Sequence, residues 1–202
     1  MQKIIPLLSF DKLPPGCFPS GTSLLTSAGD QLIETLTPGA ELVTIRVNGP
    51  NLRPIIRVTT HRIQPALIRI RAHAFAPDMP ARDLVLSGEH AIYADGALFQ
   101  LADLCNGISI FPEPAQPASL YRIELDAHDV ILAEGLPVES SPPAFAHAND
   151  NASPKIVARR PAWAPAARQK IGLPVLSDGP EFLALRRMLK HRAADKRQVL
   201  LA

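Results

Sequence analysis

Hydrophobic residues in the first 150 positions occur in short runs, with no sustained helical spacing. Runs rich in aliphatic and β-branched residues cover residues 22–26, 41–47, 54–60 and 66–72. The last of them, "ALIRIRA", alternates apolar and basic residues, which is the period of a strand with one buried face. These runs therefore predict short strands rather than helices.

The later part of this region continues the same pattern. Residues 82–104 predict a strand, a turn at Ser87-Gly88, a second strand, a turn at Asp95-Gly96, and then "LFQLADL" entering a short helix. Closing strands are expected at 119–126 and 129–140, the latter with a turn at Glu134-Gly135. Many short strands with closely spaced turn signals indicate an all-β domain. The 21 prolines agree, because proline ends helices and avoids central strands.

The composition changes near residue 150. Residues 1–150 carry 10 Lys/Arg and 16 Asp/Glu, whereas residues 151–202 carry 11 and 3. Residues 141–180 are rich in Pro, Ala, Ser and Asn, which predicts a linker or an irregular wrap. In residues 181–202, Phe182, Leu185 and Leu189 recur at helical spacing among basic residues. We therefore expect a basic C-terminal helix and tail, packed on the domain through this apolar stripe.

Composition also limits the classes of function. The basic tail alone is weak evidence for nucleic-acid binding, since the chain has one Trp and no recognised binding motif. Its two cysteines form neither a disulfide framework nor a zinc pattern, and no histidine shows ligand spacing. No metal site or cofactor is therefore expected. No apolar run approaches the roughly 20 residues of a transmembrane helix, and the start "MQKIIPLLSFDKLPPG" does not predict a signal peptide.

The most specific chemistry surrounds Cys17, which directly follows Gly16 in "PPGCFPSG". A cysteine can attack the carbonyl carbon of the preceding residue and move the acyl group from nitrogen to sulfur. Glycine leaves that carbonyl unhindered, but the shift also needs an acid for the leaving nitrogen and a donor for the oxyanion. Taken alone, a Gly-Cys pair is a weak signal, because a lone cysteine is more often a core residue.

A second candidate motif is "LSGEH", in which Ser87 precedes His90 by three residues. The expected turn at Ser87-Gly88 places both side chains at one strand end, where they could reach a common point. Histidine suits proton transfer near neutral pH. Without other motifs, His90 would be an ordinary strand histidine, and Cys105 in "LADLCNG" is expected to be a core residue.

Taken together, three segments of the chain resemble the sequence motifs of a known family. "GCFPSGTSLLTSAGDQLIETLTPGAELVT" resembles the opening of Hint domains, the self-processing modules of Hedgehog proteins and inteins, and its Gly-Cys-Phe is closest to the Hedgehog version. "RDLVLSGEHAIY" resembles their second block, usually Thr-x-x-His. "YRIELDAHDVILAEGLPVES" resembles their closing blocks. The set, with the tail "LPVLSDGPEFLALRRMLKHRA", is most similar to bacterial Hedgehog/intein-type Hint proteins.

The resemblance implies a horseshoe-like all-β fold of two pseudo-symmetric halves. It implies Cys17 as the nucleophile, His90 as the group that activates the Gly16–Cys17 bond, and Ser87 in place of the usual threonine. His128 matches the histidine of the penultimate block. Inteins end in His-Asn, whereas the matching positions here are Glu139-Ser140. With no asparagine to cyclise, C-terminal cleavage and splicing are not expected.

The sequence therefore predicts an N-terminal segment (1–16), a Hint domain (17–140), a Pro/Ala-rich linker (141–180) and a basic helix and tail (181–202). The expected function is autocatalytic cleavage or acyl transfer through a thioester at Gly16–Cys17, with the chain as its own substrate. The acyl acceptor stays open between water, a thiol and another nucleophile. The alternatives are an idle Hint-fold binding module and an interaction protein acting through its basic tail. The compartment stays open, because kinship with secreted proteins favours export while the N-terminus does not.

Overall fold

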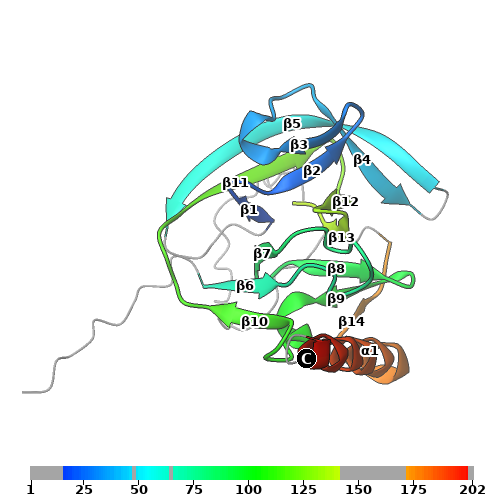
Figure 1. The fold of residues 1–202 in the computed structure, drawn as a ribbon. Coiled ribbons are helices and arrows are strands. Elements are labelled where there is room, and N and C mark those ends of the chain that lie inside the picture. The colour runs from blue at the N-terminus through cyan, green and yellow to red at the C-terminus, as the bar shows by residue number, and fades with distance from the viewer. Residues whose placement is uncertain (1–15, 47–48, 64–65, 142–171, 200–202) are drawn as a thin grey trace, which may run out of the picture.

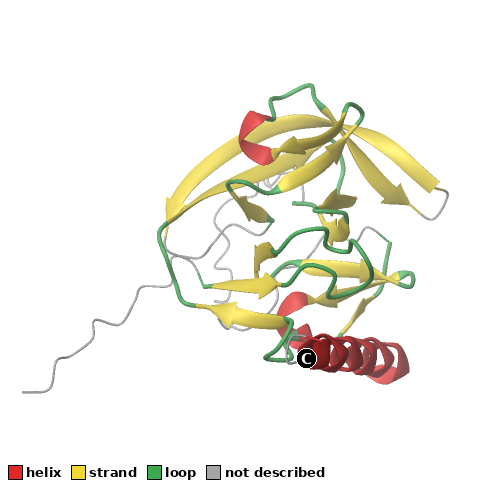
Figure 2. Ribbon diagram, in the orientation of Figure 1, coloured by secondary structure: helices red, strands yellow, loops and turns green. Residues whose placement is uncertain are grey.

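The computed structural model describes residues 16–46, 49–63, 66–141 and 172–199. The first half of the chain contains β1 (Cys17–Pro19), β2 (Ser23–Thr26), β3 (Gly29–Leu32), the 3-10 helix η1 (Ile33–Thr35), β4 (Glu41–Arg46), β5 (Gly49–Ile63), β6 (Leu67–Ile70), β7 (Leu84–Ser87), β8 (Ala91–Ala94) and β9 (Ala97–Gln100). The second half contains the 3-10 helix η2 (Leu101–Leu104), β10 (Ile110–Glu113), β11 (Ala118–Leu125), β12 (Val130–Ala133), β13 (Leu136–Glu139), β14 (Val175–Leu176) and α1 (Gly179–Val199). Figure 2 shows that strands dominate and that α1 is the one long helix of the described part. The predicted all-β class with a C-terminal helix is confirmed.

The strands form an 11-stranded sheet and a separate 3-stranded sheet. The large sheet has the order β1-β11-β5-β4-β2-β12-β13-β8-β9-β14, with β3 paired to β2, and the small sheet has the order β10-β6-β7. The first half of β5 pairs with β4 and its second half with β11. These two sets of partners explain why β5 extends beyond the expected 54–60, and it arches across the molecule in Figure 1.

Alternation along β6 follows the expected strand period. Ile68 and Ile70 are buried, whereas Arg69 points away from the core and forms ion pairs with Glu113 and Asp83. The basic residue of the "LIRI" run is therefore neutralised on the outer face while the aliphatic residues fill the inner one.

Two tight turns lie where the sequence predicted them. Asp95 and Gly96 have φ values of 46° and 81°, and Glu134 and Gly135 have 49° and 77°. Positive φ at both central residues is the requirement of the hairpin turn that matches strand twist, and glycine meets it without steric cost. Glu134 is held in this conformation by its side chain, which accepts hydrogen bonds from Arg82. The β8–β9 and β12–β13 hairpins are thus encoded locally.

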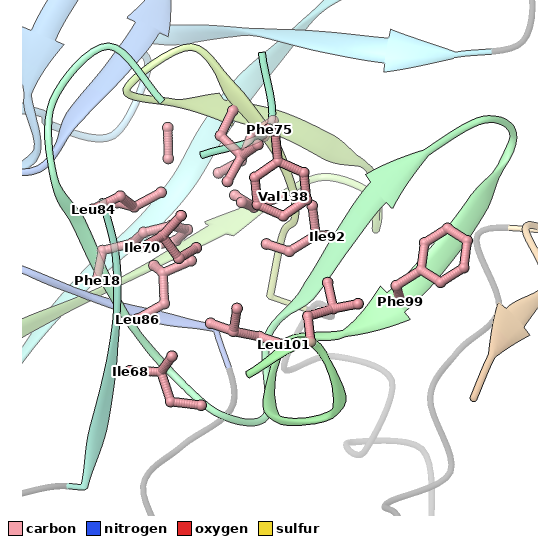
Figure 3. Packing of buried hydrophobic residues seen from close by; sticks show 14 of the residues in the cluster. Phe18, Ile68, Ile70, Phe75, Leu84, Leu86, Ile92, Phe99, Leu101 and Val138 are labelled. Carbon is pink, nitrogen blue, oxygen red and sulfur yellow. The ribbon is translucent and has the colours of Figure 1, made fainter. Parts of the chain in front are cut away.

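One hydrophobic cluster joins both sheets and the helix. It includes Phe18, Ile70, Leu86, Ile92 and Val138, whose side chains are drawn together in Figure 3. The cluster also contains the three apolar residues of α1 that the sequence placed on one stripe. α1 therefore packs on the β domain, as Figure 1 shows beside β9 and β14.

The predicted domain boundaries can be compared with the structure only in part. Residues 1–15 and 142–171 lie outside the described residues. Within the described part of the expected linker, Val175 and Leu176 form β14, which pairs in parallel with Leu98 and Phe99 of β9. A two-residue strand leaves no periodic signal, so the sequence could not predict it. The 17–140 and 141–180 boundaries stay predictions.

The packing of α1 leads to a stability prediction. Leu189 is 1% exposed in the core cluster, whereas Leu183 on the same helix is 57% exposed. Leu189→Ala should lower the free energy of unfolding by about 2–5 kcal/mol, because a buried leucine loses both its transfer energy and its packing. Leu183→Ala should change it by less than about 0.5 kcal/mol. Urea titration of the two variants measures the difference, and equal effects would contradict the packing of α1.

Candidate active site around Gly16 and Cys17

Cys17 begins β1 at one end of the large sheet. Its side chain is fully buried and its thiol is free. β1 pairs antiparallel with β11, and this register sets Cys17 opposite Arg122. Burial raises the pKa of the Cys17 thiol to about 11, and the nearby positive charge of Arg122 opposes this rise. The thiol is therefore largely protonated at neutral pH.

Gly16 adopts a backbone conformation that only glycine holds easily. Its φ is +79°, and its carbonyl oxygen accepts a hydrogen bond from the Ser141 hydroxyl at 2.9 Å. A Cβ atom on residue 16 would lie 2.1 Å from the Ser141 Oγ. The carbonyl that Cys17 would attack thus already contacts a hydroxyl donor, and Ser141 packs closely against Gly16. Any larger residue at position 16 would displace Ser141.

Ser87 and His90 occupy the turn between β7 and β8. The backbone N–H of His90 donates to the Ser87 carbonyl at 3.1 Å, and the Ser87 hydroxyl lies 3.0 Å from His90 Nδ1. Both side chains are buried. The expectation that this turn brings the two side chains together is therefore met in the structure.

The His90 ring also reaches the strand that carries Cys17. It meets the ring of Phe18 edge-on, with the ring centroids 4.9 Å apart and the planes at 63°. Phe18 directly follows Cys17, and β1 lies beside β7 in Figure 1. The structure thus brings the Gly16–Cys17 segment and the Ser87–His90 turn into one neighbourhood, although 70 residues separate Cys17 from Ser87.

His128 is placed against the closing strand. Its Nε2 lies 3.2 Å from Glu139 Oε1, and the two side chains are 6% and 8% exposed. Glu139 is the residue that the resemblance matched to the histidine of the intein ending His-Asn. The His128–Glu139 ion pair thus joins the segment before β12 to the closing strand β13.

Ser140 fixes the position of the residue that follows it. Its hydroxyl accepts from the Asp129 N–H at 3.0 Å, and its own N–H donates to the Asp129 carbonyl at 2.8 Å. Asp129 is itself held by Arg53, whose Nε donates to the carboxylate at 3.1 Å. This buried arrangement orients the chain so that Ser141 meets Gly16.

Sequence reasoning missed two residues of this site, Arg122 and Ser141. Arg122 faces Cys17 only through the β1–β11 register, which no local pattern encodes. Ser141 directly follows the closing block, and a hydroxyl at that position was the one signal available. In the described part of the chain no cluster of His, Cys, Asp or Glu could hold a metal ion, and no helix there is long and apolar enough to cross a membrane.

Comparisons with known proteins agree with this arrangement. The family model of the Hint domain matches residues 16–144. The intein-like domain of Clostridium thermocellum has 14% sequence identity and a TM-score of 0.50, with 62% of this chain and 98% of that chain covered. Identity this low concerns the fold alone.

Two other solved structures are similar at a lower level. The DnaB intein of Synechocystis sp. PCC 6803 has 13% identity and a TM-score of 0.49, with 62% of this chain and 99% of that chain covered. The DnaX mini intein of Spirulina platensis has 13% identity and a TM-score of 0.46, with 60% and 98% covered. No curated protein matches the chain. The family match spans more than half of the 202 residues and includes every element of the site. The chain belongs to the Hint domain family of protein self-processing modules.

Proposed function

We propose that the chain cuts its own Gly16–Cys17 peptide bond by an N–S acyl shift. The observation that carries the proposal is the buried hydrogen bond from Ser141 to the carbonyl oxygen of Gly16, the residue that directly precedes the buried Cys17. A donor on that oxygen is what the oxyanion of an acyl shift needs. The nearby imidazole of His90 supports the same assignment.

The reaction proceeds in two parts. The Cys17 thiolate adds to the Gly16 carbonyl carbon, and the new negative charge develops on the oxygen that Ser141 contacts. The C–N bond then breaks, and His90 gives a proton to the departing nitrogen of Cys17. The products are a thioester on Cys17 and a free amine. An acceptor next adds to the thioester carbon, the C–S bond breaks, and the thiolate returns to Cys17.

Ser87 supports His90 in this scheme. In this scheme the Ser87 hydroxyl, which lies 3.0 Å from Nδ1, acts as the donor, and this direction leaves the imidazole proton on Nε2. Ser87 thus sets the tautomer and orientation of the ring. His128 acts through Glu139 at the closing strand and supports the segment that carries Ser141.

The acceptor is water, a thiol or another nucleophile. Glu139 and Ser140 offer no side-chain amide that could cyclise, so a second cut near residue 140 and splicing are not part of the proposal. No cofactor is required, because every group in the scheme belongs to the chain.

One observation favours a second candidate, an idle Hint-fold module. The Cys17 thiol is fully buried and its pKa is raised to about 11, so few molecules carry the nucleophile at neutral pH. The two candidates differ in pH dependence. If the site is active, cleavage should accelerate about tenfold per pH unit below the thiol pKa, because the thiolate fraction grows in that proportion.

The experiment that separates them is intact-mass spectrometry of freshly purified protein incubated with dithiothreitol. The active site predicts a fragment beginning at Cys17 and a fragment ending at Gly16 that carries the thiol adduct. An unchanged mass over days at neutral and mildly alkaline pH would support the idle module and overturn the proposal.

Ser141→Ala tests the donor on the Gly16 carbonyl. We expect slower cleavage, with about 10² as the upper limit, because the hydrogen bond already exists in the ground state and only its strengthening in the transition state accelerates the reaction. The matched control is Ser109→Ala, which removes another buried hydroxyl, one that accepts from Asn106 Nδ2 and has no contact with the Gly16 carbonyl. Time courses of intact mass measure both. If Ser141→Ala is cleaved as fast as the unaltered chain, the Ser141 hydroxyl does not stabilise the transition state.

A further inference from the structure

Arg122 places a positive side chain on the strand next to the nucleophile. In the antiparallel pairing of β1 and β11, Cys17 lies directly opposite Arg122. Side chains of directly opposed residues leave the sheet on the same face, with Cβ atoms about 4.5–5.5 Å apart. The stem of Arg122 therefore starts beside the Cys17 side chain.

The guanidinium of Arg122 is held on this face by a buried carboxylate. Its Nη1 lies 3.4 Å from Glu124 Oε1, and Glu124 in turn lies 4.0 Å from the Nε of Arg57 on β5. The Arg122 side chain is only 19% exposed. Water and salt screen such a charge much less than a surface charge. Its positive charge therefore acts on the neighbouring thiol in the direction opposite to burial.

We propose that the Arg122 guanidinium stabilises the Cys17 thiolate and thereby increases the amount of the attacking nucleophile at a given pH. The inference rests on the proposed cleavage at Gly16–Cys17 and names a residue that this chemistry uses. Neither the Gly-Cys motif nor the Ser-His turn contains it.

The other charged and titratable groups around Cys17 leave this role to Arg122. Glu124 and Arg57 form a second row on the same sheet face and carry opposite charges. His90, on the β7–β8 turn, contacts the ring of Phe18, the residue next to Cys17. Burial is the larger influence and raises the pKa of Cys17, while Arg122 acts in the opposite direction. Loss of Arg122 should therefore raise this pKa further.

The test measures the thiolate directly. In a Cys105→Ala background, where Cys17 is the single thiol of the chain, the ultraviolet absorbance of the thiolate is followed against pH. The same chain with Cys17→Ala supplies the baseline, which subtracts tyrosine ionisation. Arg122→Gln should lower the thiolate fraction at a given pH about tenfold, the lower end of the range for a neighbouring opposite charge. Arg122→Lys should retain most of it.

A matched control comes from β5. Arg62 is exposed and pairs with Ser119, further along the sheet from Cys17, so Arg62→Gln removes the same charge without changing the thiolate fraction. Arg122→Met keeps the apolar stem and provides a second uncharged variant if Arg122→Gln fails to fold. A folded uncharged variant that titrates like the unaltered protein overturns the inference.

The readout also separates this inference from the proposed function. The titration needs no cleavage. A chain in which Arg122 changes the thiolate fraction but no cut occurs with dithiothreitol would refute the self-cleavage proposal while supporting the Arg122–Cys17 interaction. A chain that is cut at Gly16–Cys17, but at the same rate with and without the Arg122 charge, would support the self-cleavage proposal and refute the role of Arg122.

Discussion

A chain with Cys17 replaced by alanine should stay whole in dithiothreitol, under conditions in which the unaltered chain is cut between Gly16 and Cys17. Alanine has no nucleophilic side chain, so no thioester forms and dithiothreitol has no thioester to attack. The expected effect is complete loss. Intact mass recorded over the same time course is the measurement, with a thermal melt to show that the buried position tolerates the smaller side chain.

Cys105→Ala is the matched control for this result. Cys105 lies after η2 and packs against the core cluster, so its removal takes away a thiol but leaves the Gly16–Cys17 bond untouched. Its cleavage rate should equal that of the unaltered chain. If the Cys17→Ala chain were still cut at this bond, the cut would come from another nucleophile or from a contaminating protease, and the acyl shift would be excluded.

Replacement of His90 by alanine should slow the cleavage by a factor of about 10² to 10⁴, the range expected when a general acid is removed. The same substitution also removes the ring that meets Phe18 edge-on. His90→Phe separates the two effects, because phenylalanine keeps an aromatic ring at this buried position but cannot give a proton. We therefore expect His90→Phe to be as slow as His90→Ala while unfolding at a temperature closer to that of the unaltered chain.

Ser87→Thr completes this set. Threonine keeps the hydroxyl that lies 3.0 Å from His90 Nδ1 and holds it in fewer rotamers, so cleavage should be preserved or faster.

A rate for His90→Phe within a factor of about two of the unaltered chain would mean that another group protonates the leaving nitrogen. In that case the contact between His90 and Ser87 would serve packing alone.

Local sequence patterns predicted many of the strands and turns of the fold. The "LIRIRA" alternation, the Asp95-Gly96 turn and the Glu134-Gly135 turn each specify their own hairpin or strand through short-range geometry, and the structure confirms all three. The three-residue β1 and the two-residue β14 escaped prediction, because a strand of that length has no period to detect. Their positions follow from pairing with partners far along the chain.

The site divides in the same way. Cys17 and His90 were found through short motifs, and the structure brings their segments together through the Phe18 ring. Their catalytic roles stay predictions until cleavage is measured. Arg122 and Ser141 were missed because both reach the Gly16–Cys17 segment through long-range pairing. A single sequence contains residue types and spacings, but the register between distant strands emerges only when the whole core assembles.

The contact between Gly16 and Ser141 joins positions that are 125 residues apart. The two ends of the segment 16–141 therefore meet at one buried point of the β domain. A domain with this geometry can be placed within a surface loop of another folded protein without forcing the two flanks of that loop apart, which is the condition under which domain insertions are tolerated. For this chain the inserted unit must also include β14 and α1, because β14 pairs with β9 and because Phe182, Leu185 and Leu189 belong to the core that residues 16–141 form.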